Sequence, residues 1–139
     1  MEKFNGKWEL VTGSYENLEA FSEKMGVLKE EVEMLKNAVM TTTIKMEGNK
    51  QRMTLECNGE PMKQELCFTE GEPLEYKGFE GSNMTSDYKW NGDRIAEKHK
   101  AEKDGTTREW TVERYIEGDM MVAKSTKDDV SMTYKMKKI

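Results

Sequence analysis

The sequence of 139 residues has few cysteines, few prolines and no long hydrophobic run. No stretch approaches the ~18 consecutive apolar residues that a membrane-spanning helix needs. The N-terminal segment Met1–Gly6 has no apolar run of the kind found in export signals. Two cysteines without such a signal indicate free thiols in a reducing compartment. We therefore expect a cytoplasmic protein.

Basic charge and catalytic motifs are also lacking. Lys and Arg number 22 against 27 Asp and Glu, a net charge of −5, so no basic excess is available to bind nucleic acid. The sequence has no glycine-rich phosphate loop, no nucleophile elbow and no metal-type Cys/His spacing. His99 is the single histidine, and a lone histidine in a strand is usually a structural hydrogen-bonding group. We expect no enzymatic activity, cofactor or metal.

Large apolar side chains are present in numbers that exclude an unfolded chain. The sequence has 12 Met, 5 Tyr, 4 Phe and 3 Trp. Its apolar share of 35% is nevertheless below the usual ~45–50%. This balance suits a thin core, or an interior that the protein's own side chains do not fill.

One segment, residues 15–37, has the period of a helix. Apolar residues recur there at spacings of three and four in two stripes: Leu18, Phe21 and Met25, then Val27, Val32 and Leu35. Gly26 lies between the stripes, and glycine is a natural C-terminal cap. The pattern predicts two short helices joined near Gly26.

From residue 39 onward the apolar period changes to two, which is typical of strands with one dry face. Five runs show it most clearly, within 40–46, 53–57, 62–68, 84–90 and 130–136. Turn signals such as Asn58-Gly59 and Asn91-Gly92 recur roughly every ten residues. We expect a single domain, residues 1–139, in which an antiparallel up-and-down meander closes on itself and so avoids exposed edges.

The dry faces of these strands contain polar residues, namely Gln64, Ser86, Tyr88, Glu97, His99, Lys124 and Tyr134. Each unsatisfied buried polar group costs about 1–3 kcal/mol, so a filled core would not accept so many of them. A barrel that encloses water and a small ligand would. Flexible, polarizable methionines fit the surface of an irregular apolar ligand, so the pattern favours an internal cavity.

Several segments together form a recognisable set: Phe4-Asn5-Gly6-Lys7-Trp8-Glu9-Leu10, Asn17-Leu18-Glu19-Ala20-Phe21, Met25-Gly26-Val27, and Leu66-Cys67-Phe68-Thr69-Glu70-Gly71-Glu72. The set resembles the intracellular lipid-binding proteins, the calycin family of cytosolic fatty-acid-binding and retinoid-binding proteins. The likeness covers nearly the whole chain. It implies a ten-stranded up-and-down antiparallel β-barrel, with a helix-turn-helix lid between the first two strands.

The resemblance also implies a monomeric carrier of a hydrophobic small molecule, with Trp8 at the base of the barrel. Contact with membranes would be at most transient, because acids outnumber bases on the lid. The candidate ligand-binding residues, from alternation and resemblance together, are Phe21, Met25, Met40, Met53, Leu55, Met62, Leu74, Tyr76, Tyr88, His99, Arg114, Lys124, Met132 and Tyr134.

Many members of the family hold a ligand carboxylate with an arginine and a tyrosine near the C-terminus. This sequence does not match the full pair. Alternation places Tyr134 at the tyrosine position and Met132 at the arginine position, whereas an ungapped alignment places Lys135 and Thr133 there. Neither alignment supplies the arginine needed for a bidentate contact. A second family arginine falls at Glu113 or Arg114, and a one-residue slip exchanges their two faces.

Three hypotheses about function remain. The first is a carrier of a long-chain fatty acid, which the family implies. The second is a binder of a less acidic ligand, such as a retinoid, a bile-type molecule or a pigment, which the missing arginine favours. The third is a barrel kept as a structural or interaction module without any ligand.

Overall fold

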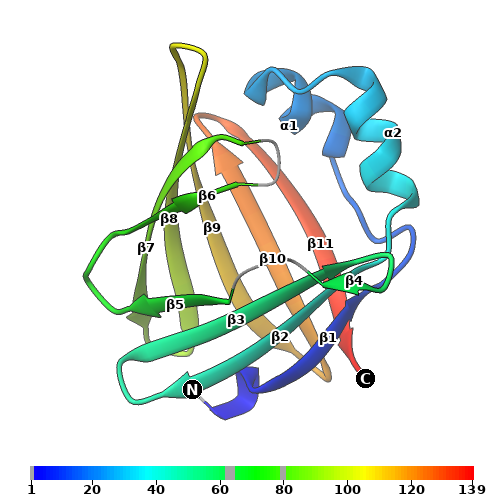
Figure 1. The fold of residues 1–139 in the computed structure, drawn as a ribbon. Helices are drawn as coiled ribbons and strands as arrows, with labels where there is room; N and C mark the ends of the chain where they lie inside the picture. Colours follow the sequence, from blue (N-terminus) through cyan, green and yellow to red (C-terminus); the bar gives the residue numbers. More distant parts are fainter. Residues whose placement is uncertain (1, 62–64, 79–80) are drawn as a thin grey trace.

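The computed structural model describes residues 2–61, 65–78 and 81–139. Antiparallel strands form a nearly closed barrel, and two helices between the first and second strands lie over one end (Figure 1). In chain order the elements are the 3-10 turn η1 (Glu2–Phe4), β1 (Gly6–Leu10), α1 (Leu18–Met25), α2 (Lys29–Asn37), β2 (Met40–Glu47), β3 (Lys50–Cys57), β4 (Glu60–Pro61), β5 (Leu66–Thr69), β6 (Leu74–Lys77), β7 (Asn83–Asn91), β8 (Arg94–Lys103), β9 (Thr106–Glu117), β10 (Met120–Lys127) and β11 (Val130–Lys138).

The strand order confirms the predicted up-and-down barrel. Consecutive strands pair with each other from β1 to β3 and from β6 to β11, and β1 also pairs with β11. Both β4 and β5 pair with β3, so they share one strand position and the described residues form ten positions. Within those residues no ladder joins β5 to β6, which is where the barrel stays open. Part of the strand expected over 62–68 lies outside the described residues.

The predicted break between the two helices is confirmed at Gly26. This residue has a φ of 76°, and its amide donates a hydrogen bond to the Glu23 carbonyl at 3.1 Å. The inward stripe of α1 is buried and packs with Met132 of β11. Only Val32 of α2 is buried, so α2 covers the barrel less tightly than α1.

A compact apolar cluster fills the interior next to η1, at the end of the barrel away from the helices (Figure 1). Trp8 is 2% exposed there, and its indole Nε1 donates a hydrogen bond to the Phe4 carbonyl at 2.9 Å. A buried indole N–H needs such a partner. The 3-10 turn and the first strand are therefore joined through one side chain.

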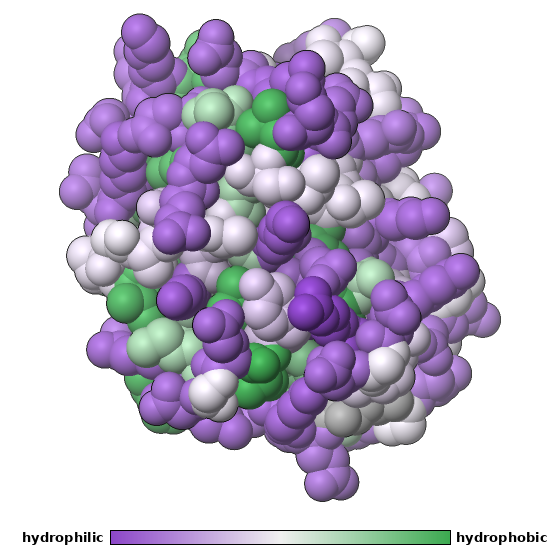
Figure 2. All heavy atoms as spheres, turned by 180° about the vertical axis from the view of Figure 1, so that it is seen from behind, coloured by the Kyte–Doolittle hydropathy of each residue, from purple (hydrophilic) through white to green (hydrophobic). Residues whose placement is uncertain are grey.

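The face of the molecule that lies behind the view of Figure 1 is mostly hydrophilic. Figure 2, seen from behind Figure 1, shows hydrophobic residues only in small separate groups among hydrophilic ones. No helix in the described part of the chain has the length and apolar character needed to cross a membrane.

Candidate functional site

A cavity of about 680 Å³ lies between the helices and the inner wall of the barrel. Its volume falls within the ~300–1,000 Å³ typical of small-molecule sites. The helices contribute mainly apolar side chains to it, and β8 to β11 contribute most of the polar ones. One region of the wall is therefore suited to a hydrocarbon chain and another to a polar group.

Most of the sequence-predicted site residues line this cavity. Those in its wall are Phe21, Met25, Met40, Met53, Leu55, Tyr76, His99, Arg114, Met132 and Tyr134. Met62 lies outside the described residues. Whether these side chains contact a ligand stays a prediction.

The inward orientation predicted for Lys124 is wrong. Lys124 is exposed, and it pairs across the sheet with Glu113 on one side and Thr133 on the other. In β10 the inward positions belong to Ala123 and Ser125. The sequence of β10 has four consecutive apolar residues before Lys124, so its alternation does not fix which face is buried.

Two further candidates, Leu74 and Tyr88, are not part of the cavity wall. Leu74 packs, half-buried, against the apolar cluster next to η1. Tyr88 is 3% exposed within that cluster, and its hydroxyl donates a hydrogen bond to the Asn49 carbonyl at 2.8 Å. Both were expected to contact the ligand; the structure instead places Tyr88 in the packed core and Leu74 half-buried against it, and neither lines the cavity.

The alternative between Glu113 and Arg114 is settled by the strand register. Arg114 points inward with its side chain 12% exposed, while Glu113 forms an ion pair with Arg94 on the outside. Arg114 pairs with Ala123, which pairs in turn with Tyr134. Because Ala123 is small, the Arg114 and Tyr134 side chains meet above it, and Tyr134 is a hydrogen-bonding neighbour of Arg114.

A chain of hydrogen bonds crosses the inner surface of β6 to β9. The Tyr76 hydroxyl lies 2.8 Å from Ser86 Oγ, which lies 2.7 Å from His99 Nδ1. On its other side His99 Nε2 lies 2.8 Å from Glu97 Oε1, and Arg114 Nε donates to Glu97 Oε2 at 2.6 Å. Each of these five side chains therefore has a protein partner.

The Glu97–Arg114 pair is buried and fully charged. Burial alone would raise the pKa of Glu97, but Arg114 and His99 outweigh it and lower that pKa to about 2. Burial would likewise lower the pKa of Arg114, but Glu97, with a smaller contribution from Tyr134, raises it above its usual value. The two charges cancel, so the pair adds no net charge to the cavity.

Two aromatic residues that sequence reasoning did not select also line the cavity. Trp110 stacks on His99 with ring centroids 5.4 Å apart, and Tyr15 packs against Tyr134 at 5.6 Å. Burial, with a smaller effect of Tyr134, raises the pKa of Tyr15 to about 12. The alternation of Trp110 with Val112 and Arg114 could have identified Trp110. Tyr15 lies in a loop, where periodicity gives no signal.

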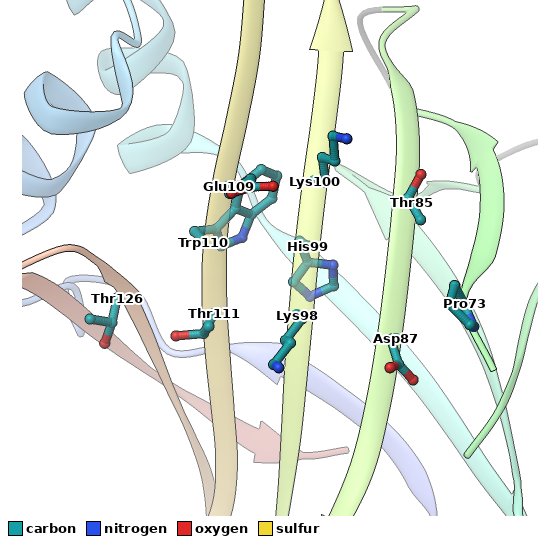
Figure 3. A pocket seen from close by; sticks show the side chains of 10 residues that line it. All are labelled: Pro73, Thr85, Asp87, Lys98, His99, Lys100, Glu109, Trp110, Thr111 and Thr126. Atoms are coloured by element: carbon teal, nitrogen blue, oxygen red, sulfur yellow. The ribbon is translucent and has the colours of Figure 1, made fainter. Parts of the chain in front are cut away.

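A second, shallower hollow of about 370 Å³ lies against the outside of β7, β8 and β9. Figure 3 shows Thr85 and Asp87 from β7, Lys98 and Lys100 from β8, and Glu109 from β9 around it. This hollow is more open to solvent than the internal cavity and has about half its volume. The internal cavity is the better candidate site.

Comparison with known proteins gives a consistent result. No family model matches the chain. The sequence is 30% identical over 133 residues to fatty acid-binding protein 1 of Fasciola gigantica, covering 94% of this chain and 93% of that protein.

Solved structures of similar fold match this chain along its whole length. A fatty acid-binding protein of Schistosoma mansoni, in complex with arachidonic acid, is 25% identical with a TM-score of 0.80, covering 100% of this chain and 98% of that one. Echinococcus granulosus fatty-acid-binding protein 1 shares the fold at 22% identity and a TM-score of 0.79, covering 100% and 99%. With a relative at 30% identity over almost its full length, the chain belongs to the fatty acid-binding protein family, whose members are non-enzymatic carriers of hydrophobic ligands.

Proposed function

We propose that the protein carries one long-chain amphiphile, with its tail among the apolar residues of the lid, β2 and β3 and its polar head near Arg114 and Tyr134. The observation that supports this most directly is the two-part lining of the 680 Å³ cavity. A long-chain fatty acid is the ligand that the names of the relatives support.

A less acidic ligand is the second candidate, and a specific contact favours it. Arg114, the cation at the polar end, is already bonded to Glu97 at 2.6 Å. Met132, which alternation aligns with the family's C-terminal arginine, adds no charge. A ligand with a hydroxyl or amide head would find donors and acceptors there without needing a free cation.

Native mass spectrometry of delipidated protein tests the carrier function. The protein is incubated with hexadecanoic acid, hexadecanol and retinol in separate samples. We expect a complex of one ligand per chain with at least one of them. Failure to take up any of these amphiphiles would contradict the proposal and favour a barrel that serves as an interaction module.

Met25→Glu is expected to slow ligand exchange. Met25 is 9% exposed on the inner face of α1 and lines the cavity. A carboxylate there must stay hydrated. It should therefore disturb the path of a ligand between α1 and the barrel more than it disturbs the folding of the strands. Stopped-flow fluorescence with a fluorescent fatty acid measures the exchange rate. Ala20→Glu, which adds the same charge at an exposed position of α1, serves as the control, and equal rates in both variants would argue against entry at this point.

Met132→Arg is expected to tighten the binding of a fatty acid relative to its alcohol. The side chain is 8% exposed and lines the cavity two residues before Tyr134. A second cation would give the interior a net positive charge and a charge-assisted donor. Competitive displacement of a neutral fluorescent probe by hexadecanoic acid and by hexadecanol measures the ratio. Thr133→Arg, which adds the same charge on the other face of β11, should leave the ratio unchanged.

A further inference from the structure

We propose that Glu97 is a built-in counter-ion for Arg114, and that it makes the cavity prefer an amphiphile with an uncharged hydrogen-bonding head over one with a carboxylate. This inference rests on the proposed carrier function and specifies the head group. A hydroxyl, an ester or a primary amide is an uncharged head group of this kind.

The geometry places a protein carboxylate where a ligand carboxylate would otherwise bind. Glu97 Oε2 accepts the Arg114 Nε hydrogen bond at 2.6 Å, and Oε1 lies 2.8 Å from His99 Nε2. Glu97 is 6% exposed, and His99 is held in turn by Ser86 at 2.7 Å. Both oxygens are engaged. If Glu97 moved away from Arg114, it would also lose its contact with His99 while its carboxylate stayed buried.

A carboxylate brought to this place would be near one positive and one negative charge at once. Its removal from water is costly in a buried site unless an opposite charge is free to compensate. The attraction of Arg114 is opposed by the repulsion of Glu97, so no net compensation is left. Two further cations line the cavity: Arg108, which donates to the Gly26 carbonyl at 3.3 Å, and Lys103, which also has an interaction partner.

An uncharged head meets a different situation. Arg114 has N–H donors besides Nε, and the Tyr134 hydroxyl lies beside it. Tyr76 and Ser86, whose hydroxyls are 2.8 Å apart, supply further groups that donate and accept. A hydroxyl or amide head can join this network without adding a charge.

The test compares Glu97→Gln with Glu113→Gln. Both remove one negative charge next to Arg114 in the sheet, but Glu113 faces outward and pairs with Arg94. Displacement of a neutral fluorescent probe by hexadecanol and by hexadecanoic acid gives the ratio of their affinities. We expect the unaltered protein to bind the alcohol at least as tightly as the acid. Glu97→Gln should shift the ratio toward the acid by about tenfold or more, and Glu113→Gln by less than about twofold.

The outcomes separate this inference from the carrier function. If neither compound displaces the probe, the carrier function itself fails. If both bind but Glu97→Gln leaves the ratio unchanged, or if the unaltered protein strongly prefers the acid, the counter-ion role of Glu97 is wrong and the carboxylate is held elsewhere.

A second variant covers the case in which Glu97→Gln does not fold. The double variant Glu97→Gln/Arg114→Gln replaces the buried pair by two amides that can bond to each other. Because the pair carries no net charge, we expect the double variant to show no marked loss of acid binding relative to alcohol. A tenfold or greater loss, on the scale of one charge-assisted contact, would show that Arg114 binds the carboxylate despite Glu97 and would overturn the proposal.

Discussion

Trp8→Ala is expected to lower the free energy of unfolding by about 3–5 kcal/mol, the usual cost of truncating a large aromatic side chain in a core. The indole is 2% exposed and packs in the apolar cluster next to η1. The substitution also leaves the Phe4 carbonyl without its indole donor at 2.9 Å. Phe4 itself is fully buried and stacks edge-on against Trp90 at 5.6 Å. The packing of the whole apolar cluster next to η1 should therefore weaken. Urea unfolding measures the resulting loss in the free energy of unfolding.

Trp8→Phe is the matched control, since it keeps a ring in the cluster and removes only the indole N–H. Its expected cost is smaller, with about 0.5–1.5 kcal/mol of it due to the lost hydrogen bond. If Trp8→Ala instead melts like the unaltered protein and loses only its ligand, Trp8 is a binding residue and its assignment to the core is wrong.

Elements with a clear apolar period were predictable from the sequence. The stripe of Leu18, Phe21 and Met25 identified α1, and the left-handed conformation at Gly26 ends it at the expected place. The period of two gave the long strands β7 and β11 and, with the turn signals, the meander. Local sequence determines these features, because each strand must bury one face and each turn needs residues that tolerate its backbone.

The polar site was predictable only in part, because it depends on how strands align with one another. Alternation placed Glu97 and His99 inward but left Glu113 and Arg114 as alternatives, and nothing in the sequence indicated that Arg114 would bond to Glu97. That contact needs the register of β8 against β9, where Ile95 pairs with Arg114 and Glu97 lies two residues further on. The error at Lys124 has the same origin, since β10 lacks a clear period and its faces follow from its neighbours.

Arg114→Met is expected to cost about 3–5 kcal/mol of stability near neutral pH, because it leaves Glu97 buried without its cation. The volume of the side chain is roughly kept, so lost packing contributes little. Arg94→Met is the matched control. It also removes an arginine from an ion pair, but the Arg94 and Glu113 side chains are 47% and 41% exposed, and such exposed pairs contribute at most about 1 kcal/mol.

The stability gap between Arg114→Met and the unaltered protein should narrow as the pH falls. In the unaltered protein the pKa of Glu97 is lowered from 4.5 to about 2, so its ionised form stabilises the fold above pH 4.5, and this contribution is lost as the pH falls toward 2. In Arg114→Met the largest of the effects that lower this pKa is absent, so burial is opposed less and the pKa of Glu97 rises. Glu97 then takes up a proton at a higher pH, which removes the cost of the unpaired charge in the variant. Over the same pH range the unaltered protein loses the stability that its ionised Glu97 contributes. Urea unfolding of both proteins at about pH 7 and about pH 3 measures the two gaps. If the difference in stability stays constant or grows at acid pH, the unpaired charge of Glu97 is not the cause of the destabilisation in Arg114→Met.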